Sequence, residues 1–115
     1  MWGKLEEIFE EIGIPYSRQG SYGETEELPS EFYTFWQTRC EPDDYYCNQA
    51  STLNHEWVVF YYTSNPETLY SGLENFIKKA EEKGFYLQSM QDISCDEPSF
   101  NGRFCKITYK EQLNN

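Results

Sequence analysis

Two stretches of the chain carry apolar residues at the three- and four-residue spacing of an amphipathic helix. In residues 2–12 the apolar positions are Trp2, Leu5, Ile8, Phe9 and Ile12. Glutamates occupy the positions between them, as on the solvent side of a helix. Gly13 and Pro15 follow, and this pair is typical of a helix C-terminus. We expect a first helix that ends near Gly13.

The second helical stretch has apolar positions at Leu69, Leu73, Phe76, Ile77 and Ala80. Asn65 precedes it as the expected N-cap, and Pro66 suits the first helical position. Gly84 follows three lysines and is expected to end the helix. The pattern therefore predicts a second helix between Asn65 and Gly84.

Runs of aromatic and β-branched residues predict five strands. The predicted strands cover residues 16–22, 31–38, 57–63, 85–93 and 103–110. In residues 57–63 both alternating sets of side chains are apolar or aromatic. We therefore expect this strand to be central and covered on both sides.

The remaining segments read as connections. Residues 24–29 form an acidic loop, and residues 40–52, with Pro42 and the pair Asp43-Asp44, form a long solvated loop. Residues 94–102 are rich in turn formers, and residues 111–115 are expected to fray. The order is thus α-β-β-β-α-β-β. We predict one domain, residues 1–115, of the α+β class, with one mostly antiparallel sheet and two helices packed on it.

Composition favours a protein that functions by binding other molecules and not by catalysis. The 115 residues include 10 Tyr, 8 Phe and 3 Trp, and aromatic side chains dominate contact surfaces. Twenty acidic and nine basic residues give the chain a formal net charge of −11, which argues against a protein that binds the phosphate backbone of a nucleic acid. No apolar run reaches the ~20 residues of a membrane span, and the N-terminus lacks a signal-peptide core. We expect a cytosolic protein that does not enter a membrane.

Cysteine spacing does not match a zinc site. Cys40, Cys47, Cys95 and Cys105 lack the short knuckle spacing, and the single histidine, His55, lies outside any ligand pattern. Free thiols are the leading interpretation, while a disulfide between Cys40 and Cys47 or between Cys95 and Cys105 stays open.

Catalytic candidates are weak. The acid pairs Asp43-Asp44 and Asp96-Glu97 fall in predicted loops without a histidine nearby, and His55 has no nucleophile signature around it. No glycine loop suited to a phosphate is present. We therefore expect no enzyme, no cofactor and no metal.

Several segments together carry a family resemblance. They are residues 11–22 (EIGIPYSRQGSY), 28–36 (LPSEFYTFW), 60–66 (FYYTSNP) with the helix ending at 83–85 (KGF), 96–98 (DEP) and 102–103 (GR). From residue 5 to about 109 the chain resembles the small tail-completion or tail-terminator proteins of long-tailed phages and prophages of Gram-positive bacteria. Residues 39–48 lie outside the resemblance.

The resemblance implies a structural protein of the virion with an α/β sandwich fold, assembled in the bacterial cytoplasm. Such proteins form a ring of copies, usually six, that caps the tail tube and joins it to the head connector. The expected partners are thus other copies of the chain, the major tail tube protein and the connector or neck protein. Genomic DNA would pass a negative lumen without specific binding. Candidate interface residues are Arg18, Glu24, Glu26, Glu27, Phe32, Trp36, Asp96, Glu97 and Arg103.

One rival within the phage class and two other function classes remain open at this stage. A neighbouring head-completion or neck component would show much the same sequence. An acidic protein that mimics DNA and inhibits a nuclease or defence complex would instead space its acids along one face. A small enzyme is the third class, with the least support in the sequence.

Overall fold

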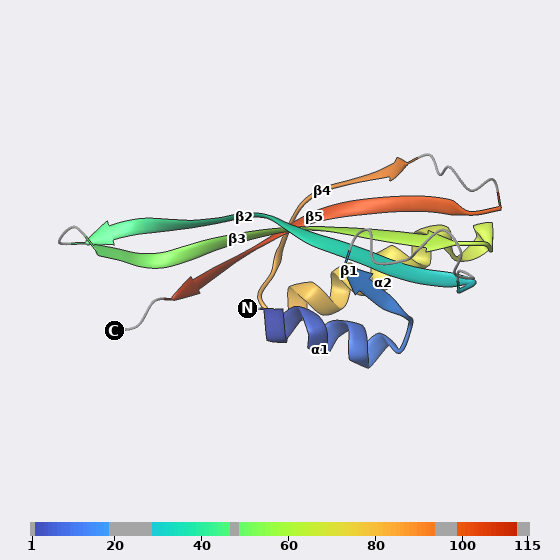
Figure 1. Cartoon of the computed structure of the whole chain (residues 1–115), viewed down its shortest axis with the longest axis horizontal. Helices are drawn as coiled ribbons and strands as arrows, with labels where there is room; N and C mark the ends of the chain where they lie inside the picture. Colours follow the sequence, from blue (N-terminus) through green and yellow to red (C-terminus); the bar gives the residue numbers. More distant parts are fainter. Residues whose placement is uncertain (1, 19–28, 47–48, 94–98, 113–115) are drawn as a thin grey trace.

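The structure of the chain, a computed structural model, describes residues 2–18, 29–46, 49–93 and 99–112 (Figure 1). The elements follow one another as α1 (Trp2–Ile12), β1 (Tyr16–Arg18), β2 (Glu31–Tyr46), β3 (Gln49–Thr63), the 3₁₀ turn η1 (Pro66–Thr68), α2 (Leu69–Glu82), β4 (Tyr86–Ile93) and β5 (Asn101–Gln112). The predicted α+β class and the predicted order of elements are confirmed.

The five strands form one sheet in the order β1-β2-β3-β5-β4. β1 runs parallel to β2, and every other neighbouring pair is antiparallel. β3 is the middle strand, as predicted for residues 57–63. Both helices lie on the same face of the sheet (Figure 1).

Helix α1 forms where its apolar spacing predicts it. Leu5, Ile8 and Phe9 are fully buried against the sheet. Gly13 ends the helix with φ +77°, a conformation that glycine adopts at no steric cost, and its N–H donates to the carbonyl of Phe9 at 3.0 Å.

The second helical segment lies between Asn65 and Gly84 as predicted, but it opens with the 3₁₀ turn η1, and α2 itself begins at Leu69. The side chain of Asn65 accepts the backbone N–H of Glu67 at 3.0 Å, and Pro66 opens η1, which leads directly into α2. Its apolar stripe is buried at Leu73, Phe76, Ile77 and Ala80. Lys83 then reaches Glu7 and Glu11 of α1 at 3.3 and 3.2 Å, so ion pairs join the two helices on their outer side.

Aromatic rings form much of the core between the helices and the sheet. Phe9 lies at their centre, with ring centroids of Tyr16, Phe76, Tyr33 and Phe35 between 4.8 and 5.6 Å away. Aromatic pairs at such distances add stability beyond the area that they bury. The core therefore depends on α1 as much as on α2.

The predicted loop at residues 40–52 is wrong. β2 continues to Tyr46, and β3 begins at Gln49 and pairs with β2 all the way to Thr63. We call residues 36–46 of β2 and 49–56 of β3 the hairpin arm. It extends past the helices and gives the molecule a length of 54 Å against widths of 27 and 23 Å (Figure 1).

The loop was predicted partly from Pro42, because proline interrupts the hydrogen bonds of a central strand. β1 pairs with β2 only from Tyr33 to Phe35. Beyond Phe35, the strands that the structure describes flank β2 on one side only, and proline is tolerated in such an edge strand.

Other boundaries shift for related reasons. The strand predicted at residues 16–22 is seen at Tyr16–Arg18, and the rest of it lies outside the described residues. Residues 111–112 do not fray as predicted, because β5 pairs there with Leu53 and Thr52 of the arm, and residues 113–115 lie outside the described residues. The described part of residues 94–102 ends in β5, which begins at Asn101. Among the described residues, neither helix is long and apolar enough to cross a membrane.

Candidate functional site

Aromatic side chains line the sheet on the face turned away from the helices. Phe32 stacks on Tyr62 with centroids 5.1 Å apart, and Trp36 lies 5.4 Å from Phe60. Phe60 also contacts Tyr62 and Phe104 at 6.2 and 5.5 Å. We call these five residues the aromatic face. The strand predicted to be covered on both sides has helices over one side only, and on its other side the packed rings of the sheet itself shield it.

Exposure rises along this face toward the arm. Phe32, at the start of β2, keeps 6% of its surface exposed, whereas Trp36, where the arm begins, keeps 36%. The structure thus brings two predicted interface residues, Phe32 and Trp36, to one surface. Trp36 is the one that another molecule can reach.

Arg103, a predicted interface residue, is engaged inside the subunit. Its Nε donates to Asp92 Oδ1 at 2.7 Å, and its guanidinium lies 4.4 Å from the ring centroid of Tyr70. The Tyr70 hydroxyl donates to the other oxygen of Asp92 at 3.1 Å. Arg103 itself is nearly buried. The sequence did not reveal Asp92 as its partner, because the two residues meet only through the pairing of β4 with β5.

The remaining predicted interface residues are spread out. Arg18 is exposed at the end of β1. Five acids lie outside the described residues: Glu24, Glu26, Glu27, Asp96 and Glu97.

A polar cluster fixes the base of the arm, and no motif in the sequence indicated it. Gln37 Nε2 donates to His55 Nδ1 at 2.8 Å, so Nε2 of His55 carries the proton and donates to Glu111 Oε1 at 2.8 Å. This hydrogen bond lowers the pKa of Glu111. The three side chains come from β2, β3 and β5, and Glu111 lies 56 residues from His55 along the chain. His55 therefore ties three strands together.

A shallow cavity of about 250 Å³ opens beside this cluster. Its lining includes Arg39, Glu41, Asn54, Glu56 and Gln88. The charges in it are partly satisfied, since Thr38 donates to Glu56 at 2.7 Å and Arg39 lies 3.6 Å from Glu41. No group of three or more histidine, cysteine or acidic side chains suited to a metal occurs among the described residues. His55 and Thr108 complete the lining of the cavity.

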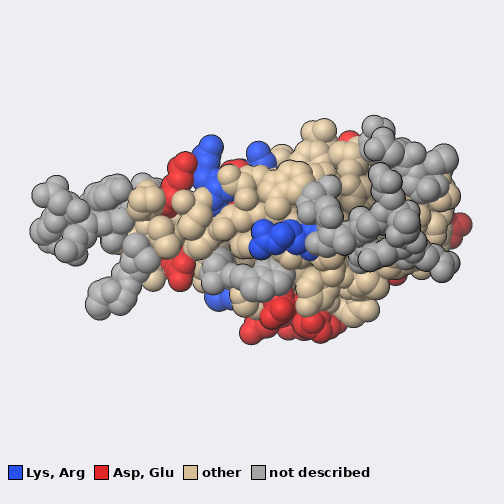
Figure 2. Space-filling model, in the orientation of Figure 1, with Lys and Arg blue, Asp and Glu red and all other residues tan. Residues whose placement is uncertain are grey.

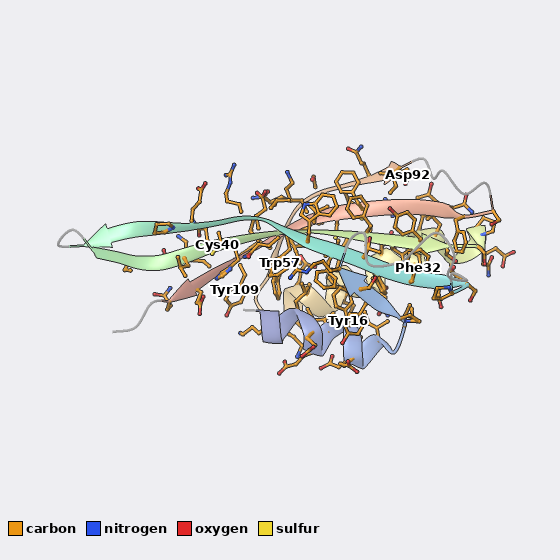
Figure 3. All side chains as sticks on the ribbon, in the orientation of Figure 1. Tyr16, Phe32, Cys40, Trp57, Asp92 and Tyr109 are labelled. Atoms are coloured by element: carbon orange, nitrogen blue, oxygen red, sulfur yellow. The ribbon has the colours of Figure 1, made fainter. Side chains whose placement is uncertain are left out.

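The two described cysteines, Cys40 and Cys105, carry free thiols. Cys40 is exposed on the arm, beyond the part of the sheet that the helices cover (Figure 3). Cys105 is fully buried in the core, and burial raises the pKa of its thiol to about 12. Cys47 and Cys95 lie outside the described residues.

Two core tyrosines and the half-buried Tyr16 also hold their protons tightly. Burial raises the pKa of Tyr33, whose hydroxyl donates to the carbonyl of Gly72 at 2.9 Å. Burial and the hydrogen bond to Glu31 raise the pKa of Tyr61. The hydrogen bond to Glu10 raises the pKa of Tyr16 to about 12. In each case the fold favours the neutral hydroxyl.

Alkaline pH is therefore expected to unfold the protein. A group whose pKa is raised by folding stabilises the fold below its ordinary pKa, and that stability is lost as the pH rises through the folded value. For Cys105 the window runs from 9 to about 12, and for Tyr16 from 10 to about 12. The thermal unfolding midpoint should be level near neutral pH and fall above pH 9. In a Cys105→Ala variant the fall should begin about one pH unit later, and a midpoint level up to pH 12 would contradict the prediction.

No protein-family model matches the chain, and a search of curated proteins found no match to it.

Proposed function

We propose that the chain is a virion structural protein whose copies form a ring that ends the tail tube and joins it to the head connector. The observation that carries the proposal is the hairpin arm. It extends beyond the helices, and from residue 36 onward no strand described in the structure pairs with the outer side of β2. The α+β fold also agrees with what the resemblance to tail-terminator proteins implies.

The exposure of the arm suggests that another molecule packs against it. Residues 36–42 are all exposed, so this strand buries little of its own surface. Past the pairing of Thr52 with Gln112, the described part of the arm is a two-stranded ribbon, and such a ribbon without a covering layer is marginally stable in water. Contact with a neighbouring copy or with the tube would supply the missing layer.

The distribution of acids suits a lumen that DNA passes through. Figure 2 shows acidic side chains along the lower side of the molecule, where α1 lies in Figure 1. Glu6 and Glu10 are exposed there. Glu7 and Glu11 pair with Lys83, and Glu11 also lies 3.8 Å from Lys79. Lysines neutralise part of this negative surface, so it repels DNA phosphates but does not reproduce the charge of DNA. This favours a lumen over a DNA mimic.

The proposal is tested in a producer strain that lacks the gene. We expect filled heads that accumulate separately from headless tails of uncontrolled length, and restoration of particles by the wild-type gene. A gene in which Asn-Gly replaces residues 44–51 should fail to restore them, since this shortens the arm but keeps the pairing of Asp43 with Thr52.

The matched control is Asn75→Lys on the exposed side of α2, which should restore particles as well as the wild type does. Infectious particles formed in the absence of the protein would refute the proposed function.

A further inference from the structure

The strand β4 forms one margin of the sheet, and among the described residues no strand lies beyond it (Figure 1). Residues 86–89 of this strand are all exposed. The described chain leaves β4 at Ile93 and resumes at Ser99, two residues before β5. Six peptide links join these two residues and span at most about 22 Å, too short to turn back beside Ser89 and return to β5. The outer edge of β4 is therefore open at residues 86–89.

Exposed apolar side chains accompany this open edge. Tyr86 has 69% of its surface exposed and Leu87 has 38%, and they are two of the four large hydrophobic residues exposed in the described part of the chain. The other two, Trp36 and Tyr70, each contact a side chain of the same subunit. An open edge exposes unpaired N–H and C=O groups and readily accepts a strand from another molecule.

Two residues of β4, Leu87 and Met90, point toward the helices. They are paired with Ile107 and Cys105 of β5, which are buried in the core, and paired residues of an antiparallel ladder lie on the same face. Strict alternation would put Leu87 and Met90 on opposite faces, since they are three positions apart. They share a face because the register of β4 shifts at Gln88, the extra residue of a bulge.

The other residues of this stretch point away from the helices. The partners of Tyr86, Ser89 and Gln91 in β5 alternate with the two core residues. Gln88 lines the cavity together with Thr108, the paired residue of Tyr86, so it lies on the same face. From residue 86 to residue 91 the order of faces is therefore the same in both directions, with its midpoint between Gln88 and Ser89.

This symmetry makes the strand a suitable antiparallel partner for a second copy of itself. A two-fold axis between Gln88 and Ser89 places Leu87 opposite Met90 and Tyr86 opposite Gln91, and every pair from 86 to 91 then lies on one face. A shift of the register by one or two residues would oppose side chains of different faces. A bulge can protect an edge from pairing, but here the bulges of the two copies meet at the axis.

Charge also favours this partner. The chain has a formal net charge of −11, and two such copies repel each other over most of their surface. Residues 86–91 carry no charge, so the two strands can meet without like charges opposite one another. Asp92 would lie opposite Phe85, and its carboxylate is already paired with Arg103 at 2.7 Å.

We propose that two copies of the chain join through β4 around this two-fold axis, so that their sheets become one continuous sheet. The exposed Leu87 of each copy then contacts Met90 of the other, which is half-buried against its own core. The contact is isologous, with the same residues contributed by both copies. The inference goes beyond the proposed function and does not rest on it. A two-fold contact does not close a ring, so its surface differs from those that would join copies around the tube.

The test compares two double variants that differ in one charge. Tyr86→Lys with Gln91→Lys places like charges opposite each other twice in the pair, whereas Tyr86→Lys with Gln91→Glu places opposite charges there. We expect the dissociation constant of the first variant to be about tenfold larger. The overall charge predicts the reverse, because the first variant lowers the net negative charge of each copy. Within one strand the two positions are about 17 Å apart, so these charges oppose each other only between copies.

The control is the same pair of substitutions at Gln91 with Tyr86 unchanged. Gln91→Lys and Gln91→Glu then lie opposite an uncharged ring, and their dissociation constants should differ by about threefold at most. Sedimentation equilibrium measures all four variants, and circular dichroism verifies that each is folded. A wild-type protein that stays monomeric at millimolar concentration would overturn the inference. Equal association of the two double variants would also overturn it, since the copies would then join through another surface or in another register.

Discussion

Gly72→Ala is expected to destabilise the fold by about 3 kcal/mol and to lower the unfolding midpoint by about 10 °C. In most helices this substitution is favourable, since alanine is the better helix former by about 1 kcal/mol. Here a Cβ atom on Gly72 would lie 2.5 Å from Cε2 and 2.6 Å from the hydroxyl oxygen of Tyr61. The steric cost therefore outweighs the helix propensity.

Tyr61 cannot move aside to accept that methyl group. Its side chain is fully buried, and its ring lies 5.0 Å from the ring of Tyr33. Its hydroxyl donates to Glu31 Oε2 at 2.5 Å. A shift of the ring would break this hydrogen bond or disturb the core, and either outcome is costly.

Gly3→Ala is the matched control for Gly72→Ala. Gly3 lies in α1, and no atom lies within 4 Å of the position of its added Cβ. The same substitution should there leave stability unchanged or raise it by up to ~1 kcal/mol. Chemical denaturation of both variants measures the difference, and a Gly72→Ala protein as stable as the wild type would contradict the close approach of α2 to β3.

Phe9→Ala is expected to cost about 4 kcal/mol, because it removes a large side chain from a fully packed site. Phe9 is fully buried, and it contacts rings from β1, β2 and α2. The cavity left by the substitution would separate α1 from the rest of the molecule. Loss of this much free energy is a large fraction of the stability of a small domain.

Tyr86→Ala is the control for Phe9→Ala, since it also removes an aromatic ring. Tyr86 is 69% exposed, and its loss should change the stability of the single subunit by about 0.5 kcal/mol at most. Urea denaturation at low protein concentration separates the two effects. Equal losses in both variants would show that α1 is not part of the cooperative core.

The helices could be predicted from the sequence because their signals are local. Apolar spacing identifies the buried side of α1, and Asn65, Pro66 and Gly84 mark the two ends of the second helical segment. Each of these signals acts within a few residues of the chain. The central strand was predictable for a similar reason, since residues 57–63 are apolar on both faces.

The hairpin arm could not be predicted in the same way. Pro42 and the acids beside it are typical of a loop, and only the position of β2 at the edge of the sheet makes them acceptable in a strand. The candidate site has the same difficulty. Gln37, His55 and Glu111 meet because three strands are in register, and nothing near any one of them in the sequence indicates the other two.

A single extra residue is accommodated in the arm without changing the faces of the residues that follow it. The register of β2 against β3 shifts between Gln37 and Arg39, and Thr38 is the unpaired residue of this bulge. Paired residues of an antiparallel ladder lie on the same face, so removal of Thr38 would leave Arg39 opposite Glu56 and Cys40 opposite His55 on their present faces. A one-residue deletion at this point would therefore remove the local bend and the hydrogen bond from Thr38 to Glu56, and it would leave the pattern of side chains on the arm intact.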